Sequence, residues 1–63
     1  MQTSKVLRMS SLIQKVGLSR ASIYRLMDQG GFPKSFKIGA SAIGWDEADI
    51  DKWIAERKSA THH

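Results

Sequence analysis

Hydrophobic side chains recur at helical spacing close to the start of the chain. Residues 11–16, "SLIQKV", place their hydrophobic positions on one face and predict a short helix. Ser10 precedes this run and is of a residue type that caps helix N-termini well. Residues 6–9, "VLRM", place hydrophobic side chains around one arginine, so this segment predicts a short strand or an extended lead-in.

A tight break separates this segment from a second helical pattern. Gly17 can take the left-handed conformation that ends a helix, and Ser19 is a good N-cap for the next one. The second helix should run from Arg20 to about Gln29, after which two glycines and Pro33 stop it. Its inner face is hydrophobic and consists of Ile23, Leu26 and Met27. Its outer face and flanks consist of Arg20, Ala21, Ser22, Tyr24, Arg25 and Asp28.

The period changes from helical to alternating after the proline. The stretch "KSFKIGASAIGW" predicts a β-hairpin over Ser35–Trp45 with its turn near residues 39–41. The order of elements is then helix, tight turn, helix, hairpin and helix. This order predicts a mostly α-helical fold with a small β-hairpin.

The last part of the chain predicts a third helix that Asp46 caps. Acidic residues stand in its first turn, and Arg57 and Lys58 stand in its last turn, as the helix dipole favours. The hydrophobic positions Ile50, Trp53 and Ile54 share one face. We expect Trp53 to be an anchor of the small core.

Charge is distributed unevenly along the 63 residues, whose net charge is +4. Residues 1–44 carry seven basic residues and one acid, a net charge of +6, whereas residues 45–63 carry three basic residues and five acids, a net charge of −2. A basic body beside an acidic helix indicates a polyanionic partner on one side of the molecule. An unevenly charged, solvated surface is the alternative interpretation.

The chain offers little of the chemistry that enzymes use. It has no cysteine, and both histidines stand at residues 62–63, which resemble a purification-tag remnant. The acids at residues 46–51 lack the spacing of a calcium loop, and no glycine-rich phosphate motif is present. We therefore expect no catalytic residue, metal, cofactor or small-molecule substrate. We expect a single cytoplasmic domain over residues 1–63 with no membrane partner.

Two short helices joined by a tight glycine-containing turn are typical of the helix-turn-helix, whose second helix enters the major groove of duplex DNA. On this hypothesis the contacts from the second helix come from Ser19, Arg20, Ala21, Ser22, Tyr24 and Arg25. Lys34 and Lys37 would contact phosphates from the hairpin and its flank, with Lys5 and Arg8 as weaker candidates. Arginine suits this role because its guanidinium can bond guanine bidentately or pair with phosphate.

Each of these residues also has an explanation without DNA. Arg20 can be an ordinary solvated side chain, although its place in the first turn opposes the helix dipole. Arg25 can pair with Asp28 three residues further on, a surface pair of little energetic value. Tyr24 can equally cover the edge of the core, and the lysines of the hairpin are typical solvent-exposed residues.

Five short motifs follow one another along the chain: "GLSRASIYRLM" from residue 17, "GGFPK" from 30, "KIG" from 37, "AIGW" from 42 and "WIAER" from 53. In this order and at these spacings they resemble the AlpA family of prophage regulators over residues 6–57. That family is similar to the MerR-like and excisionase winged-helix proteins. The resemblance therefore implies a winged helix-turn-helix with a recognition helix over residues 19–29 and a wing over residues 35–45.

The resemblance also implies a function, namely a small regulator that binds specific duplex DNA and often controls an adjacent integrase gene in a bacterial or phage-derived element. It implies wing contacts from residues 37–41. Many relatives have arginine where this chain has Ser41, which implies weaker insertion into the minor groove. An excisionase-like factor that bends DNA and a protein-interaction adaptor are the alternative functions. Further copies of the chain on adjacent DNA are a second candidate partner.

Overall fold

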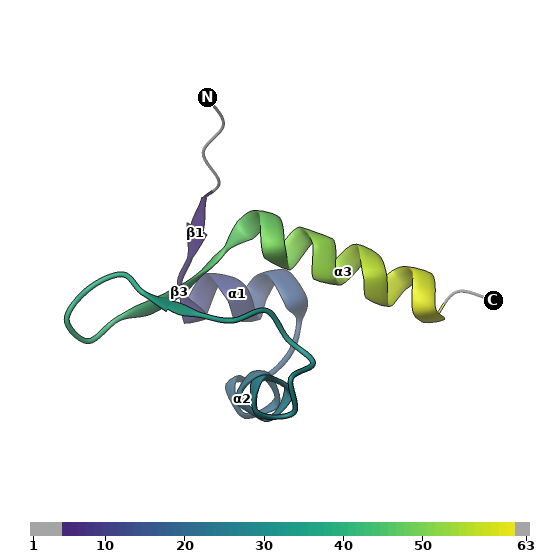
Figure 1. Ribbon diagram of the computed structural model, residues 1–63, viewed down its shortest axis with the longest axis horizontal. Helices are drawn as coiled ribbons and strands as arrows, with labels where there is room; N and C mark the ends of the chain where they lie inside the picture. The colour runs from purple at the N-terminus through teal and green to yellow at the C-terminus, as the bar shows by residue number, and fades with distance from the viewer. Residues whose placement is uncertain (1–4, 62–63) are drawn as a thin grey trace.

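The elements follow the predicted order, with one strand added at the start. The structure, a computed structural model, describes residues 5–61. It consists of β1 (Val6–Leu7), α1 (Met9–Val16), α2 (Arg20–Asp28), β2 (Phe36–Lys37), β3 (Ile43–Asp46) and α3 (Glu47–Thr61). Figure 1 shows the β2–β3 hairpin projecting at one end of the molecule, α3 running toward the other end, and α2 below them. The tag-remnant prediction for residues 62–63 lies outside the described residues.

The sheet is antiparallel and three-stranded, and β3 is its central strand. On one side Leu7 pairs with Trp45, and on the other side Lys37 pairs with Ile43. The hairpin is closed by the Ile38 N–H, which donates to the Ala42 carbonyl over 3.0 Å. The predicted hairpin is therefore confirmed, and the segment before α1 is a short strand rather than a mere lead-in.

The start of α1 differs from the prediction that Ser10 caps it. The helix begins at Met9, and Arg8 is its N-cap residue without a side-chain cap. Arg8 has an extended backbone, with φ −85° and ψ 169°, and its carbonyl accepts the Leu12 N–H over 2.8 Å. The Ser10 prediction is wrong because the chain passes from β1 into the helix with one residue between them, so the strand sets where the helix begins.

The core is small and draws on nearly every element. Leu12, Ile23, Trp45 and Ile50 are fully buried, and Leu7 and Phe32 are 7% exposed. Burial of one such side chain stabilises the fold by roughly 1.5–3 kcal/mol. Trp53 was expected to anchor this core, but it is only half-buried and packs against it from the side, while Trp45 lies at the centre.

The third helix begins as the sequence predicts. The Asp46 Oδ1 accepts the Ala48 N–H over 2.9 Å, and Glu47 and Asp49 stand in the first turn. Lys58 stands in the last turn, where a cation is favoured by the helix dipole. The same prediction is wrong for Arg57, because α3 continues to Thr61 and so places Arg57 before the last turn. Within residues 5–61 no helix is both long enough and apolar enough to span a bilayer.

Candidate nucleic-acid interface

The turn between α1 and α2 sets the direction of the second helix. Gly17 has the left-handed φ of 73°, and its N–H donates to the Ile13 carbonyl over 2.8 Å, which ends α1. Ser19 then caps α2, because its Oγ accepts the Ser22 N–H over 3.1 Å. The Ser19 hydroxyl also donates to the Ser22 Oγ over 3.0 Å. Both predictions for this turn are confirmed, and α2 leaves it in a fixed orientation.

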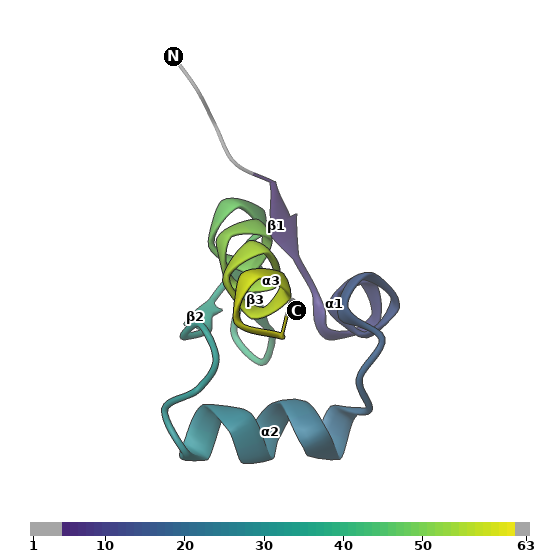
Figure 2. The ribbon, with the colours of Figure 1, turned by 90° about the vertical axis from the view of Figure 1, so that its right-hand side faces the viewer.

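One side of α2 faces outward along its whole length. Figure 2 shows the helix lying across the edge of the molecule, with α1 and α3 on its inner side. The inner side chains are those of the fully buried Ile23 and the half-buried Leu26 and Met27. The exposed residues of the helix are Arg20, Ala21, Tyr24, Arg25 and Asp28. The outer face is therefore the one that the helical pattern predicted.

The alternative explanations for these side chains can now be compared with the geometry. Tyr24 is 44% exposed, so much of its ring lies outside the core. Among residues 5–61 no ion pair joins Arg25 to Asp28. Ser22 is half-buried, and its hydroxyl oxygen accepts a hydrogen bond from Ser19. The two arginines and the tyrosine are thus accessible on the α2 surface, together with Ala21 and Asp28.

The hairpin presents a second accessible surface. Lys34, Lys37 and Ser41 are all exposed, as the sequence predicts for side chains on a wing. Phe36, on the same strand as Lys37, is 44% exposed. Small side chains at residues 39–42 form the tip, so the basic side chains stand along the hairpin and not at its end.

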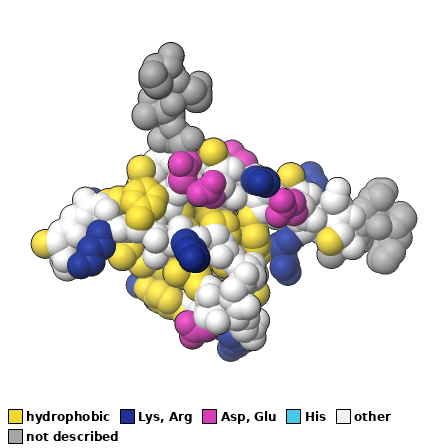
Figure 3. All heavy atoms as spheres, viewed as in Figure 1, with side chains coloured by type: hydrophobic (Ala, Val, Ile, Leu, Met, Phe, Trp, Pro, Cys, Tyr) yellow, Lys and Arg dark blue, Asp and Glu magenta, His cyan; other side chains and the backbone are white. Residues whose placement is uncertain are grey.

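Lys15 was counted with the basic body, but the fold brings it against the acidic start of α3. Its Nζ lies 2.9 Å from Asp51 Oδ1 and 3.2 Å from Glu47 Oε2. Hydrogen bonds to Asp51 and then to Glu47 raise the pKa of Lys15 above its ordinary value of 10.5. Figure 3 shows most acidic side chains in view over α3, with basic side chains among them, and further basic side chains over the hairpin and α2. The positive surface therefore excludes Lys15.

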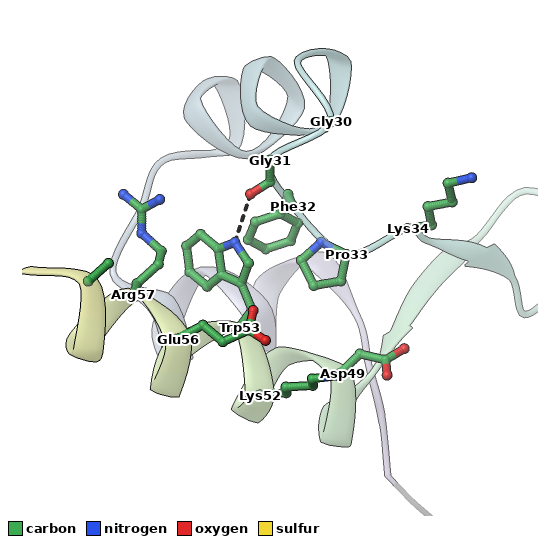
Figure 4. Close-up of a pocket in the computed structure, with 11 residues that line it drawn as sticks. Gly30, Gly31, Phe32, Pro33, Lys34, Asp49, Lys52, Trp53, Glu56 and Arg57 are labelled. Carbon is green, nitrogen blue, oxygen red and sulfur yellow. Dashed lines mark hydrogen bonds between the residues drawn. The ribbon is translucent and has the colours of Figure 1, made fainter.

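Two tryptophans hold the loop that follows α2, a feature that the sequence analysis did not foresee. The Trp53 Nε1–H donates to the Gly31 carbonyl over 2.7 Å (Figure 4), and the Trp45 Nε1–H donates to the Pro33 carbonyl over 3.2 Å. The Phe32 ring lies edge-on to Trp53, with ring centroids 4.7 Å apart. The signal in the sequence was the need of an indole N–H for an acceptor. The loop in turn carries Lys34 toward the wing.

The fold is that of a winged helix-turn-helix protein. It has two helices joined by a tight turn, the second of them exposed along one side, followed by a hairpin and a third helix. The chain belongs to the family described as "Prophage CP4-57 regulatory protein (AlpA)", which matches residues 5–58. It is 37% identical over 59 residues to the DNA-binding transcriptional activator AlpA of Escherichia coli (strain K12), with 84% of each chain covered. It is also 32% identical over 53 residues to the uncharacterized protein ORF88 of Enterobacteria phage P4, with 84% of this chain and 60% of that protein covered.

Proposed function

We propose that this chain is a single winged helix-turn-helix module that binds specific duplex DNA and regulates transcription of prophage or integrative-element genes, such as an integrase gene. The proposal includes the expectation that it acts by binding and not by catalysis. The observation that carries it is the outer face of α2, where Arg20 and Arg25 are exposed while Ser19 fixes one end of the helix. Membership of the AlpA family and the similarity to a DNA-binding transcriptional activator support it.

In this proposal α2 lies in the major groove, which is about 12 Å wide and accommodates an α-helix. Arg20 and Arg25 face the base edges, where a guanidinium bonds the O6 and N7 of guanine bidentately. Tyr24 lies between them on the same face and has a hydroxyl that can donate to a phosphate. The two tryptophan hydrogen bonds hold the α2–β2 loop, and with it Lys34, in a defined position relative to α2. Lys34 can therefore contact a phosphate while α2 contacts the bases.

The wing takes a lesser part in this binding. Lys37 contacts a phosphate from β2, while Ser41 at the tip contributes no charge to the minor groove, where arginine is the side chain that narrow grooves attract. Because one helix reads few base pairs, we also propose that further copies bind adjacent sites. Footprint length and the number of chains bound per duplex measure this directly.

Footprinting on the DNA that flanks the chain's own gene tests the proposal and supplies a duplex for fluorescence anisotropy. Arg20→Ala and Arg25→Ala should each weaken binding by about 1–3 kcal/mol if these residues read bases. Arg25→Lys keeps the charge but loses the bidentate geometry, so it should lose sequence preference more than affinity. Lys52→Ala is the control for a lost charge, because Lys52 is exposed on α3 and lines the groove that also holds Asp49 and Glu56, and not the outer face of α2.

Different results would assign a different function. Unchanged affinity in both arginine variants would mean that another face binds DNA. Absence of any footprint, together with a protein partner in a pull-down, would favour the adaptor. Strong bending in a gel permutation assay, with loss of excision by the neighbouring integrase when the gene is deleted, would favour the excisionase-like role on the same surface.

A further inference from the structure

The third helix is longer than the core requires. Ile54 is its last residue that packs against the core, whereas residues 55–60 are all exposed. The last seven residues of α3, 55–61, add roughly 10 Å of helix beyond that point. Figure 1 shows these last turns and the hairpin loop at opposite ends of the molecule, with α2 between and below them. The end of α3 and the β2–β3 hairpin therefore lie on opposite sides of α2.

A basic side chain on this end is fixed relative to the loop after α2. The Arg57 guanidinium lies 4.7 Å from the centre of the Trp53 ring, which is the distance of a cation–π contact. Trp53 is itself held by its 2.7 Å hydrogen bond to the Gly31 carbonyl. Figure 4 shows Arg57 rising from α3 toward the side on which α2 lies. The charge of Arg57 thus has a defined place near α2, so little further side-chain entropy would be lost when it binds an anion.

A cleft of 270 Å³ runs between the end of α3 and the α1–α2 turn. It is lined by Lys15, Val16, Leu18, Trp53, Ile54, Arg57 and Lys58, with no acidic side chain among these described residues. Leu18 directly precedes Ser19, so the cleft opens beside the N-terminal end of α2. A helix N-terminus favours an anion through its exposed N–H groups and dipole. The cleft therefore adds two cations, Arg57 and Lys58, to an end of α2 that is already positive.

The larger groove on the other side of Trp53 is less suited to an anion. Its volume is 520 Å³, and its charged lining residues are of both signs: Lys34, Asp49, Lys52, Glu56 and Arg57. The two carboxylates there oppose a phosphate, whereas the described residues that line the smaller cleft include no carboxylate. The charge distribution thus selects the cleft at the α1–α2 turn.

We propose that Arg57 and Lys58 form a second phosphate-binding element, which contacts the DNA strand on the side of α2 opposite the wing. This inference rests on the proposed function. With α2 in a major groove about 12 Å wide, one backbone passes on each side of the helix. The hairpin reaches one backbone and the end of α3 reaches the other, so the molecule grips both strands although its wing tip carries no charge.

Arg57→Gln and Lys58→Gln test the proposal by fluorescence anisotropy over a range of salt concentrations, with the footprinted duplex as the probe. Each lost phosphate contact should reduce the slope of log K against log salt by about 0.9. If the variant and the wild type bind equally at 1 M salt, where counterion release contributes nothing, the variant should bind roughly eightfold more weakly than the wild type at 0.1 M salt. Lys52→Gln removes a charge of the same sign from the same helix and should change neither quantity. Because Lys58 is exposed near the end of α3, Lys58→Gln should fold normally, so it tests the proposal even if Arg57→Gln unfolds.

Ethylation interference identifies the strand concerned. In the wild-type complex, ethylated phosphates on the strand opposite the wing should weaken binding, and this interference should disappear in Lys58→Gln. Unchanged slopes in both variants, in a protein whose Arg25→Ala variant binds more weakly, would overturn this inference and leave the proposed function standing. If the wild-type protein binds no duplex at all, the proposed function fails first, so the two failures are distinguishable.

Discussion

Gly44 is the position where the smallest substitution should have a clear structural cost. It is buried in β3, between β1 and β2, and pairs with Phe36. A Cβ at this position would lie 2.7 Å from Val6 Cγ1, 3.0 Å from the Leu7 carbonyl oxygen and 3.3 Å from Ile38 Cδ1. The first and third of these atoms belong to side chains that can move. The Leu7 carbonyl belongs to the backbone of β1, so Gly44→Ala must shift the strand itself.

The magnitude follows from two opposing effects. Overpacking of a filled site typically costs about 1–3 kcal/mol. Alanine in place of glycine recovers roughly 0.5–1 kcal/mol, because it restricts the unfolded chain. We therefore expect Gly44→Ala to lower the free energy of unfolding by about 1 kcal/mol, near the middle of the roughly 0–2.5 kcal/mol that the two effects leave. In a domain of this size each kcal/mol lowers the Tm by about 4–8 °C, which circular dichroism on thermal unfolding resolves easily.

The hairpin supplies a matched control for this prediction. At Gly39 an added Cβ meets only the Ala42 Cβ at 3.8 Å, an ordinary contact, and the backbone φ is not positive. Gly39→Ala should therefore stay within about 0.5 kcal/mol of the wild type. The double variant Val6→Ala with Gly44→Ala removes the shortest contact and should recover part of the loss. A Gly44→Ala protein as stable as Gly39→Ala, or one whose whole loss is removed by Val6→Ala, would refute the reasoning, because the contact with the Leu7 carbonyl would then cost nothing.

Two further predictions concern the α1–α2 turn and the ion pairs of Lys15. Gly17→Ala should destabilise the protein by about 1–2 kcal/mol in urea unfolding, because the φ of 73° at this position is left-handed. No atom lies within 4 Å of the added Cβ, so the cost is conformational and not steric. Gly17→Asn should lose less stability, and equal losses in the two variants would contradict the conformational cause. Because the pKa of Lys15 is raised above 10.5 in the folded state, its contribution to stability is complete below pH 10.5 and is lost as the pH rises through the folded pKa. The stability difference between wild type and Lys15→Gln, measured by urea midpoints, should shrink over that alkaline range, and a pH-independent difference would argue against the two ion pairs.

The helix-turn-helix was predictable because its signals are local. Gly17 and Ser19 act through their own backbone and side-chain geometry, so the end of α1 and the start of α2 follow from residue type alone. The outward direction of Arg20 and Arg25 follows from the helical period once Ile23 is placed in the core. These predictions needed no knowledge of what the rest of the chain does.

The predictions that failed depended on contacts between distant parts of the chain. Ser10 is a good N-cap by type, but β1 pairs with β3 some forty residues later, and the position of that strand makes α1 begin at Met9. Lys15 counts as a basic residue by composition, but α3 brings Glu47 and Asp51 to its Nζ. Local pattern reasoning has no access to either pairing, because both are set by the register of the sheet and the direction of the last helix.

The same long-range packing changes how the charge at the end of α3 is interpreted. In the sequence, Arg57 and Lys58 stand in the last turn of a helix, where the dipole alone explains them. In the fold, Arg57 stacks on a tryptophan that is hydrogen-bonded to the loop after α2, and both residues line a cleft beside the start of α2. Because α3 continues to Thr61, the dipole accounts for the sign of Lys58 in the last turn, but neither for Arg57 nor for the tryptophan that fixes it. The proposed second phosphate-binding element gives a role to both residues, and in that proposal it supplies positive charge that Ser41 at the wing tip does not.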